Sequence, residues 1–453
     1  MRIVTAVSIV AVSFAAFGAI PIVSTGETVA FMGDSITYYG YSRPFGYIHL
    51  VMKGLESVGV RASAMPAGAG GHKSDQMLAR LEKDVISRKP NWMALSCGVN
   101  DVYHAHLPGR KGVPLSDYRR NMTEILDRCD VAGIKVILMT PTMITENTDD
   151  VQNVELEAYC AWLRKVASER NLPLADLNRE MRKTVASMRK REGDSGDKLT
   201  RDGIHMTADG DEMIAIAFLS AIGIDARNDG RVRQAWAEYR REVLADESRF
   251  VPLLNGRDLG GWEGATNTYC ITQDGLLTCR QGSVGGRNGI RNLWTKRDYA
   301  DFAIRFDVKL PVNANNGLGI RTKPNGWCSR DGMEIQLLDD WGDRYNGTNR
   351  LSDVHYTGAI YGVVPPKRKP DGTTYLKPTG EWNSVEVTAI GTKISVNLNG
   401  ERIVDADVAE FTTDGMVPPD GIKRPGLHSR SGRLHWCGHG ADIFWRNVRI
   451  LEL

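Results

Sequence analysis

The sequence has almost no charge imbalance. Lys and Arg number 57 against 55 Asp and Glu, for a formal net charge of +2, and no run of basic residues is longer than Arg189-Lys190-Arg191. Proteins that bind a nucleic-acid backbone usually carry clustered positive charge, so no nucleic-acid partner is expected. With 42% hydrophobic and 25% charged residues, the composition also excludes a disordered chain.

Long hydrophobic runs are scarce as well. One follows Met1-Arg2, where the segment from Ile3 to Ala19 contains no charged residue and ends in small side chains. This pattern is typical of a secretory signal peptide, and a buried strand or an uncleaved anchor is the alternative. Residues 1–24 are therefore predicted to be a signal peptide, the protein is expected to be secreted or periplasmic, and no membrane span is expected after signal removal.

Cysteine is sparse, and the count of 7 is odd, so at least one thiol has no partner within the chain. Cys270 and Cys279 flank the turn pair Asp274-Gly275. A two-residue turn there would place the two cysteines directly opposite each other on a hairpin, where a disulfide can form. Two half-buried thiols are the alternative.

The length of 453 residues indicates two or three domains. From residue 25 to 228, short apolar segments alternate with amphipathic ones, which predicts a doubly wound, flavodoxin-like α/β domain with a parallel sheet. Strands are expected at 28–32, 60–65, 92–97, 135–140 and 173–177. Helices are expected at 45–58, 74–88, 115–132, 154–170 and 208–222.

The character of the chain changes after residue 249. Residues 229–249 are charged and helix-prone without a strong apolar stripe, so they are predicted to form a helical connector. Residues 250–453 contain seven of the ten Trp, many turn pairs and no convincing helix. This region is predicted to be an all-β jelly-roll sandwich.

Polar residues follow three successive strands of the predicted parallel sheet. Ser35 follows the first strand, the glycine loop containing Gly71 follows the second, and Asn100 follows the third. Because parallel strands end at one edge of a sheet, these residues are expected to line one crevice. Asp202 and His205, three residues apart, can face the serine from one loop. A serine needs such an imidazole to take its proton, and the imidazole needs an acceptor on its other nitrogen.

In these motifs the region from about residue 28 to 223 resembles an SGNH (GDSL-type) hydrolase. The resemblance implies Ser35 as nucleophile, His205 as general base and acid, and Asp202 as the group that orients it. It also implies that Gly71 and Asn100 donate to the oxyanion together with the Ser35 N–H. No metal or other cofactor is expected for this chemistry.

The second domain contains Asn316-Gly317-Leu318-Gly319, Met333-Glu334-Ile335-Gln336 and the terminal segment Trp445-Arg446-Asn447-Val448. In these and other blocks it is similar to the 3-keto-disaccharide hydrolase domain, which implies a concanavalin-like jelly roll.

Four residues of this domain are candidates for binding a sugar substrate. Glu334 and Gln336 share one face of a strand, and Asp339 would join them if a bulge shifted the register. Arg321, on the neighbouring strand, is expected to bind a hydroxyl or steady a carboxylate. Paired carboxylates are required for glycosidic cleavage, and a buried polar network is the alternative.

Together these features predict a secreted serine esterase that removes acyl groups, most simply acetyl, from a carbohydrate or acylated glycan. One alternative places the main reaction in the second domain, as hydrolysis of 3-keto-glycosides. Another treats that domain purely as a glycan-binding module.

Overall fold

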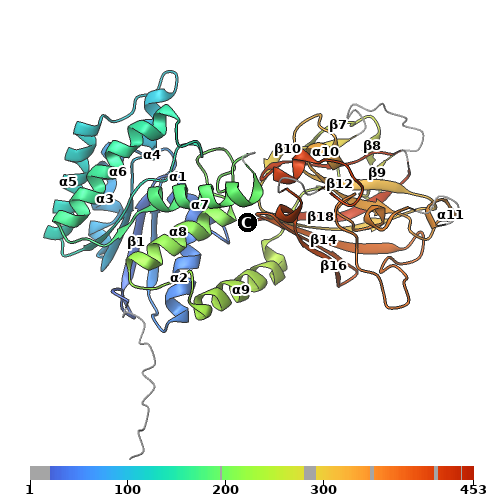
Figure 1. Ribbon diagram of the computed structural model, residues 1–453, viewed down its shortest axis with the longest axis horizontal. Coiled ribbons are helices and arrows are strands. Elements are labelled where there is room, and N and C mark those ends of the chain that lie inside the picture. Colours follow the sequence, from blue (N-terminus) through green and yellow to red (C-terminus); the bar gives the residue numbers. More distant parts are fainter. Residues whose placement is uncertain (1–20, 194–195, 280–291, 347–350, 413–416, 440) are drawn as a thin grey trace, which may run out of the picture.

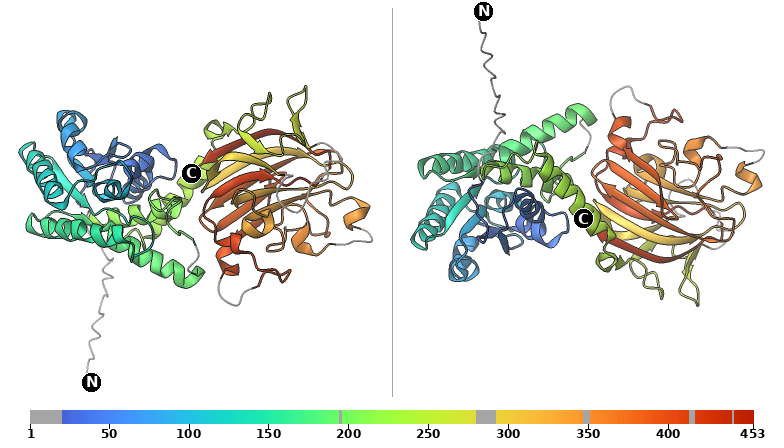
Figure 2. Two further views of the ribbon diagram at one scale, coloured as in Figure 1. Left: turned by 90° about the horizontal axis from the view of Figure 1, so that it is seen from above. Right: turned by 90° about the horizontal axis from the view of Figure 1, so that it is seen from below.

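The computed structural model describes residues 21–193, 196–279, 292–346, 351–412, 417–439 and 441–453. The predicted signal peptide lies almost entirely outside the described residues. Figures 1 and 2 show two domains side by side, a helical one coloured blue to green and a strand-rich one coloured yellow to red. Among the described helices, none is both long and apolar enough to cross a membrane.

The first domain is built on a parallel sheet of five strands in the order β2-β1-β3-β4-β5. This is the flavodoxin-like strand order, so the predicted fold class is confirmed. The strands are β1 (Thr28–Gly33), β2 (Ser63–Gly68), β3 (Trp92–Ser96), β4 (Lys135–Met139) and β5 (Leu174–Ala175).

Helices cover both faces of this sheet (Figure 1). They are α1 (Ser35–Ser42), α2 (Tyr47–Ser57), α3 (Ser74–Asp84), α4 (Val99–Tyr103), α5 (Leu115–Val131), α6 (Val151–Glu169), α7 (Leu177–Glu192) and α8 (Ala208–Ala221). The sequence interpretation missed α1, α4 and α7. A helical signal was present in α7, where Leu177, Met181, Val185 and Met188 recur at helical spacing and are buried.

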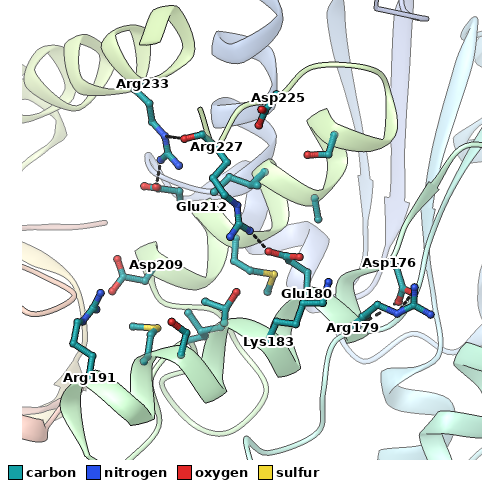
Figure 3. Close-up of a pocket in the computed structure, with 18 of the residues that line it drawn as sticks. Asp176, Arg179, Glu180, Lys183, Arg191, Asp209, Glu212, Asp225, Arg227 and Arg233 are labelled. Carbon is teal, nitrogen blue, oxygen red and sulfur yellow. Dashed lines mark hydrogen bonds and ion pairs between the residues drawn. The ribbon is translucent and has the colours of Figure 1, made fainter. Parts of the chain in front are cut away.

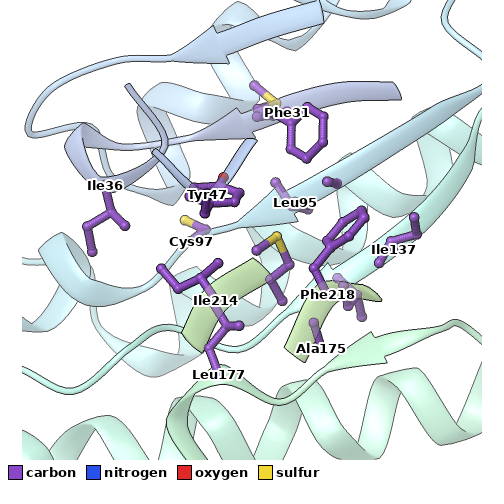
Figure 4. Close-up of a cluster of buried hydrophobic side chains, with 14 of the residues drawn as sticks. Phe31, Ile36, Tyr47, Leu95, Cys97, Ile137, Ala175, Leu177, Ile214 and Phe218 are labelled. Atoms are coloured by element: carbon purple, nitrogen blue, oxygen red, sulfur yellow. The ribbon is translucent and has the colours of Figure 1, made fainter. Parts of the chain in front are cut away.

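Aromatic side chains fix the first strand against two helices (Figure 4). Phe31 of β1 packs on Tyr47 of α2 and Phe218 of α8, with ring centroids 6.1 and 5.6 Å apart. All three side chains are fully buried or nearly so. This packing holds the end of β1, and the residues that follow it, in a defined position.

The second domain consists of two packed antiparallel sheets, as predicted. One has the order β13-β12-β17-β10-β7, and the other runs β16-β15-β14-β11-β18-β9-β8 with β6 paired to β18. The strands are β6 (Val251–Pro252), β7 (Trp262–Gly264), β8 (Tyr269–Ile271), β9 (Leu277–Cys279), β10 (Leu293–Tyr299), β11 (Phe302–Lys309), β12 (Asn315–Thr322), β13 (Met333–Leu338), β14 (Trp382–Ile390), β15 (Lys393–Leu398), β16 (Glu401–Asp407), β17 (Gly432–Trp436) and β18 (Phe444–Glu452). Two short helices, α10 (Cys328–Asp331) and α11 (Asp343–Asn346), interrupt them.

The hairpin formed by β8 and β9 differs from the prediction. Cys279 pairs with Tyr269, and Cys270 pairs with Thr278. The Thr272 N–H donates to the Leu276 carbonyl at 2.8 Å, so the loop has three residues instead of two and the register moves by one. Because neighbouring strand residues point to opposite faces, the prediction that the two cysteines lie directly opposite each other is wrong.

The predicted connector contains helix α9 (Gly230–Ala245), and this helix is packed against the first domain. Val232, Trp236 and Val243 are buried, and the Trp236 indole N–H donates to the Leu50 carbonyl at 2.7 Å. Arg305 of β11 donates to the Leu244 carbonyl at 2.6 Å. The helix therefore joins the two domains through specific contacts instead of acting as a loose linker.

A buried carboxyl group, Asp211 in α8, is expected to make the stability of the fold depend on pH. It accepts a hydrogen bond from the Tyr47 N–H at the start of α2, and burial raises its pKa to about 7. A raised folded-state pKa contributes stability below about pH 4 that is lost as the pH rises through about 7. Asp211→Asn keeps an acceptor oxygen without the charge. We expect it to stabilise the protein by on the order of 2 kcal/mol at about pH 8.

The measurement is denaturant unfolding of the wild type and of Asp211→Asn at about pH 4 and at about pH 8. The gain should disappear near pH 4, where the wild-type group is protonated. An equal effect at both pH values would show that charge burial at Asp211 is not its cause.

Candidate active site

Ser35 is the first residue of α1, and a single residue, Asp34, separates it from the end of β1. Asp34 caps this helix, and its carboxylate accepts the Ile36 N–H at 2.9 Å. The strand must end in glycine, because a Cβ on Gly33 would lie 2.0 Å from the Thr37 hydroxyl. The sharp strand-to-helix turn leaves the Ser35 side chain partly exposed at the carboxyl edge of the sheet.

His205 and Asp202 approach this serine from the loop before α8. His205 Nε2 lies 2.9 Å from Ser35 Oγ, and His205 Nδ1 lies 2.6 Å from Asp202 Oδ2. The other oxygen of Asp202 accepts the backbone N–H groups of Ile204 and His205, at 3.1 and 2.8 Å. The structure thus brings three of the predicted site residues into one hydrogen-bonded chain.

Partial burial raises the pKa of Asp202, but its hydrogen bonds with His205 outweigh this effect, and the net result lowers the pKa to about 2. Asp202 is consequently ionised at neutral pH. An ionised carboxylate holds the Nδ1 proton of the imidazole and favours the imidazolium that forms when Nε2 takes a proton.

Asn100 and the glycine loop lie beside this chain. The Asn100 amide donates to the Asp34 carboxylate at 3.4 Å and to the His72 carbonyl at 3.2 Å. Gly71 precedes His72 and has a φ of +74°, a conformation that favours glycine. The loop and the amide therefore border the Ser35 end of α1, and their role as oxyanion donors stays a prediction.

Asp101 holds the glycine loop in place through its contacts with Ser74. It is buried, and it accepts both the N–H and the hydroxyl of Ser74, the latter at 2.5 Å. This contact ties α4 to the start of α3 and so fixes the glycine loop between β2 and α3.

The sequence interpretation missed Glu146, which organises the loop that carries His205. Its buried carboxylate accepts the N–H groups of Lys198, Leu199 and Thr200 at 2.7, 2.7 and 2.8 Å. It also accepts the Thr200 hydroxyl at 2.9 Å. No local sequence signal marks this residue, because all four bonds join it to a segment some 50 positions away along the chain.

Glu146→Gln replaces one of these acceptor oxygens with a donor, so at least one loop N–H loses its partner. We expect kcat for ester hydrolysis to fall about 10- to 100-fold with little change in KM, because the reacting groups shift while the binding surface stays. The measurement is steady-state kinetics of Glu146→Gln. The control variant is Glu155→Gln, which changes an exposed glutamate paired with His106. An equal loss in both variants would contradict a positioning role.

The second domain contacts the same loop on both sides of His205. Asp301 accepts the Ala208 N–H at 2.6 Å, and the Ser431 hydroxyl donates to the Arg201 carbonyl at 3.2 Å. Near the end of α7, the buried Arg430 pairs with the buried Glu192. The loop that carries Asp202 and His205 is therefore held by both domains.

Arg321 belongs to this interface and not to a sugar site. Its side chain is fully buried and donates to Asp301 at 3.1 Å, to the Ala300 carbonyl at 2.8 Å and to the Gly391 carbonyl at 2.5 Å. It does steady a carboxylate, as expected, but that carboxylate is Asp301. A side chain without solvent exposure does not offer its charge to a sugar, so the predicted substrate contact is wrong.

The other three candidates of the second domain separate into two groups. Glu334 and Gln336 lie on the sheet face opposite Met333, Ile335 and Leu337, which enter the core. Asp339 lies beyond the strand and accepts the Asn313 N–H at 2.8 Å and the Thr379 hydroxyl at 2.6 Å. The pairing of β12 with β13 is regular, so the bulge on which the joining of Asp339 to Glu334 depended is absent.

Three metal-ligand side chains that the sequence interpretation did not select lie next to Glu334. The ligand atoms of Cys328, His435 and Cys437 are all within 4.8 Å of one another. The available signal was the spacing of His435 and Cys437, since residues two apart in extended chain share one face.

A charged cleft of about 980 Å³ lies away from Ser35 and His205. It is bounded by α7, α8 and the β15–β16 edge of the second domain, and Figure 3 shows its charged lining. The charges are largely matched, since Arg227 pairs with Glu180 and Arg233 with Glu212 (Figure 3). It adds no residue to the site around Ser35.

A serine, an imidazole and a carboxylate linked in this order at the carboxyl edge of a doubly wound sheet form the arrangement of a serine hydrolase. Residues 31–213 match the GDSL-like Lipase/Acylhydrolase family, and residues 249–451 match the 3-keto-alpha-glucoside-1,2-lyase-like domain. Both predicted resemblances are confirmed: a match to the GDSL-like acylhydrolase family is followed by a match to the 3-keto-disaccharide hydrolase domain.

Individual relatives match less than half of the chain. The acetylxylan esterase of Geobacillus stearothermophilus is 28% identical over 220 residues, which cover 45% of this chain and 97% of the relative. The structure of the acetyl xylan esterase AlAXEase has 31% identity and a TM-score of 0.40, covering 43% of this chain and 99% of the other. A protein of Parabacteroides distasonis designated a glycosyl hydrolase has 25% identity and a TM-score of 0.38, covering 45% and 99%. The acetylxylan esterase relative and the acylhydrolase family match together support a carbohydrate esterase.

Proposed function

We propose that the protein is an exported serine esterase that removes acetyl groups from a carbohydrate. The observation that carries the proposal is the hydrogen-bonded chain from Ser35 through His205 to Asp202. Its position in a domain similar to an acetylxylan esterase supports an acetylated sugar as the substrate class. Export is proposed from the apolar N-terminal segment of the sequence.

In this mechanism Ser35 Oγ attacks the ester carbonyl while His205 Nε2 takes its proton. Asp202 holds the Nδ1 proton of the imidazole and stabilises its charged form. The negative charge on the carbonyl oxygen is met by the Ser35 and Gly71 N–H groups and the Asn100 amide, each worth roughly 10²–10³ in rate. His205 then gives its proton to the departing sugar oxygen, which leaves as a hydroxyl, and a water molecule releases acetate from Ser35 by the same steps.

The test is acetate release from acetylated xylo-oligosaccharides by the intact protein. The same protein should react with a fluorophosphonate probe, and peptide mapping should find the label on Ser35. Labelling without acetate release would retain the serine esterase and reject the acetylated sugar as its substrate. An absence of both would reject the proposal.

For the second domain we propose a sugar-directed role, with cleavage of a 3-keto-glycoside as the second candidate activity. The family match over residues 249–451 favours it. If the intact protein and its Ser35→Ala variant cleave such a substrate equally, a second activity resides in this domain. Binding without cleavage would indicate a glycan-binding module.

A further inference from the structure

Four side chains able to bind a metal gather on one face of the five-stranded sheet in the second domain. Glu334 lies on β13, His435 on β17, Cys437 directly after β17, and Cys328 at the start of α10. All four are at least nine-tenths buried. The Cys328 thiol donates to Glu334 Oε2 at 3.1 Å, which joins the carboxylate to the three mutually close ligand atoms.

Strand β12, which lies between β13 and β17, has glycines at the positions where this cluster needs room. Gly319 pairs with Glu334 on one side and with His435 on the other. A Cβ on Gly319 would lie 1.9 Å from His435 Cε1, and a Cβ on Gly317 would lie 2.2 Å from Glu334 Oε1. Two side-chain-free positions on β12 thus make room for ligands from both neighbouring strands.

His435 is left without hydrogen bonds in this cluster. Its ring is fully buried and stacks on Trp294 with centroids 3.9 Å apart. Within the described part of the chain, neither ring nitrogen has a hydrogen-bond partner. Buried polar atoms are almost always satisfied, because leaving them unpaired costs free energy. A ligand that accepts a nitrogen lone pair would satisfy this imidazole.

Zinc binds cysteine as the thiolate and histidine as the neutral imidazole, so binding would displace the thiol protons and release them to solvent. The cation would compensate the negative charge of the thiolates and the carboxylate, which are otherwise costly to bury.

We propose that Cys328, Cys437 and His435, with Glu334 as fourth ligand, bind a zinc ion. Two thiolates and an imidazole suit zinc and disfavour Mg²⁺ and Ca²⁺, which prefer oxygen ligands. Four protein ligands without solvent exposure describe a closed site, so the ion has a structural role. It would fasten α10 to the sheet face formed by β13, β12 and β17.

A disulfide between Cys328 and Cys437 is the competing use of the same sulfur atoms. It would consume both thiols and leave His435 without a partner. The two states differ in metal content and in free thiols, so one set of measurements separates them.

The experiment uses the full chain, purified with reductant, stripped with a chelator and titrated with Co²⁺ and then Zn²⁺. We expect about one equivalent of metal per chain and a thiolate-to-cobalt charge-transfer band in the near ultraviolet, displaced by zinc. Cys437→Ser and His435→Gln should each weaken binding about 10-fold or more. Cys129→Ser, a buried cysteine of the first domain, should leave it unchanged.

If a variant does not fold, the wild type alone still decides the question. The chelated protein should lose thermal stability that Zn²⁺ restores and Mg²⁺ does not. A folded chain that binds cobalt without a thiolate band would overturn the proposal. So would a Cys328–Cys437 disulfide recovered from metal-free protein purified without reductant.

Discussion

Ser35→Ala is expected to reduce acetyl ester hydrolysis by at least about 10³-fold while the protein stays folded. The Ser35 hydroxyl lies 2.9 Å from His205 Nε2. Among the described residues it is the only nucleophile hydrogen-bonded to that nitrogen. Loss of the hydroxyl leaves the oxyanion donors and the binding surface intact. The residual rate should therefore be the rate that these groups alone can support. Asp34, and not Ser35, caps α1, so the helix should keep its stability.

Release of acetate over a range of substrate concentrations, together with a thermal melt, provides the measurement. Ser42→Ala is the matched control, because Ser42 is an exposed serine at the other end of the same helix. Its rate should equal that of the wild type. If Ser35→Ala kept more than a tenth of the activity, the nucleophile would have to be sought elsewhere.

The fold of the first domain could be predicted because each buried strand is a short apolar run followed by a periodic helix. Strand β3, whose five residues are all buried, was placed within one residue of its observed end. Strand β2 was placed three residues too early, since it is the edge strand and alternates between exposed and buried positions. It also contains Pro66, which an edge strand tolerates because one of its sides lacks a partner.

The central residues of the site could be predicted for a different reason. Ser35 adjoins the end of a strand, and Asp202 and His205 are neighbours in sequence, so local spacing already restricts their geometry. Glu146 and Asp301 support the same loop through contacts 52 and 93 residues away along the chain. Such roles arise only when the tertiary structure brings a buried carboxylate to distant N–H groups.

The second domain shows the limit of strand alternation. The alternation rule correctly placed Glu334 and Gln336 on one face of a strand. The same rule could not show that Arg321 adopts a φ of +52°. The pairing of β12 with β17 is irregular between Gly319 and Thr322, and this irregularity lets the Arg321 guanidinium reach Asp301. A single irregular residue therefore converts an expected ligand contact into a buried ion pair within the second domain, whose Asp301 also contacts the first domain.

The second domain helps to position the catalytic loop of the first, because it contacts the loop that carries His205. Asp301 is held by Arg321 and the Gly391 N–H, so it presents a fixed oxygen to the Ala208 N–H. The first residue of α8, only three positions after His205, is thereby anchored in the other domain. Residues that position the imidazole thus extend beyond the acylhydrolase family match at residues 31–213.

Asp202→Asn is expected to lower kcat for acetyl ester hydrolysis by about 10⁴-fold, although it changes only one atom of the side chain. The asparagine oxygen can still accept the N–H groups of Ile204 and His205, so the loop should keep its shape. The amide NH₂ would then face His205 Nδ1 and donate to it. This forces the remaining imidazole proton onto Nε2, which can no longer take the proton of Ser35.

The matched control is Asp209→Asn, four residues after His205. Within the part of the chain that the structure describes, its carboxylate has no hydrogen bond to the imidazole or to Ser35. Kinetics for both variants should show a large loss for Asp202→Asn and a small one for Asp209→Asn, with similar melting temperatures. Because the pKa of Asp202 is lowered to about 2, the wild-type rate should also show no titration of this carboxylate above about pH 4. A loss of less than tenfold in Asp202→Asn would mean that the imidazole is oriented by another group.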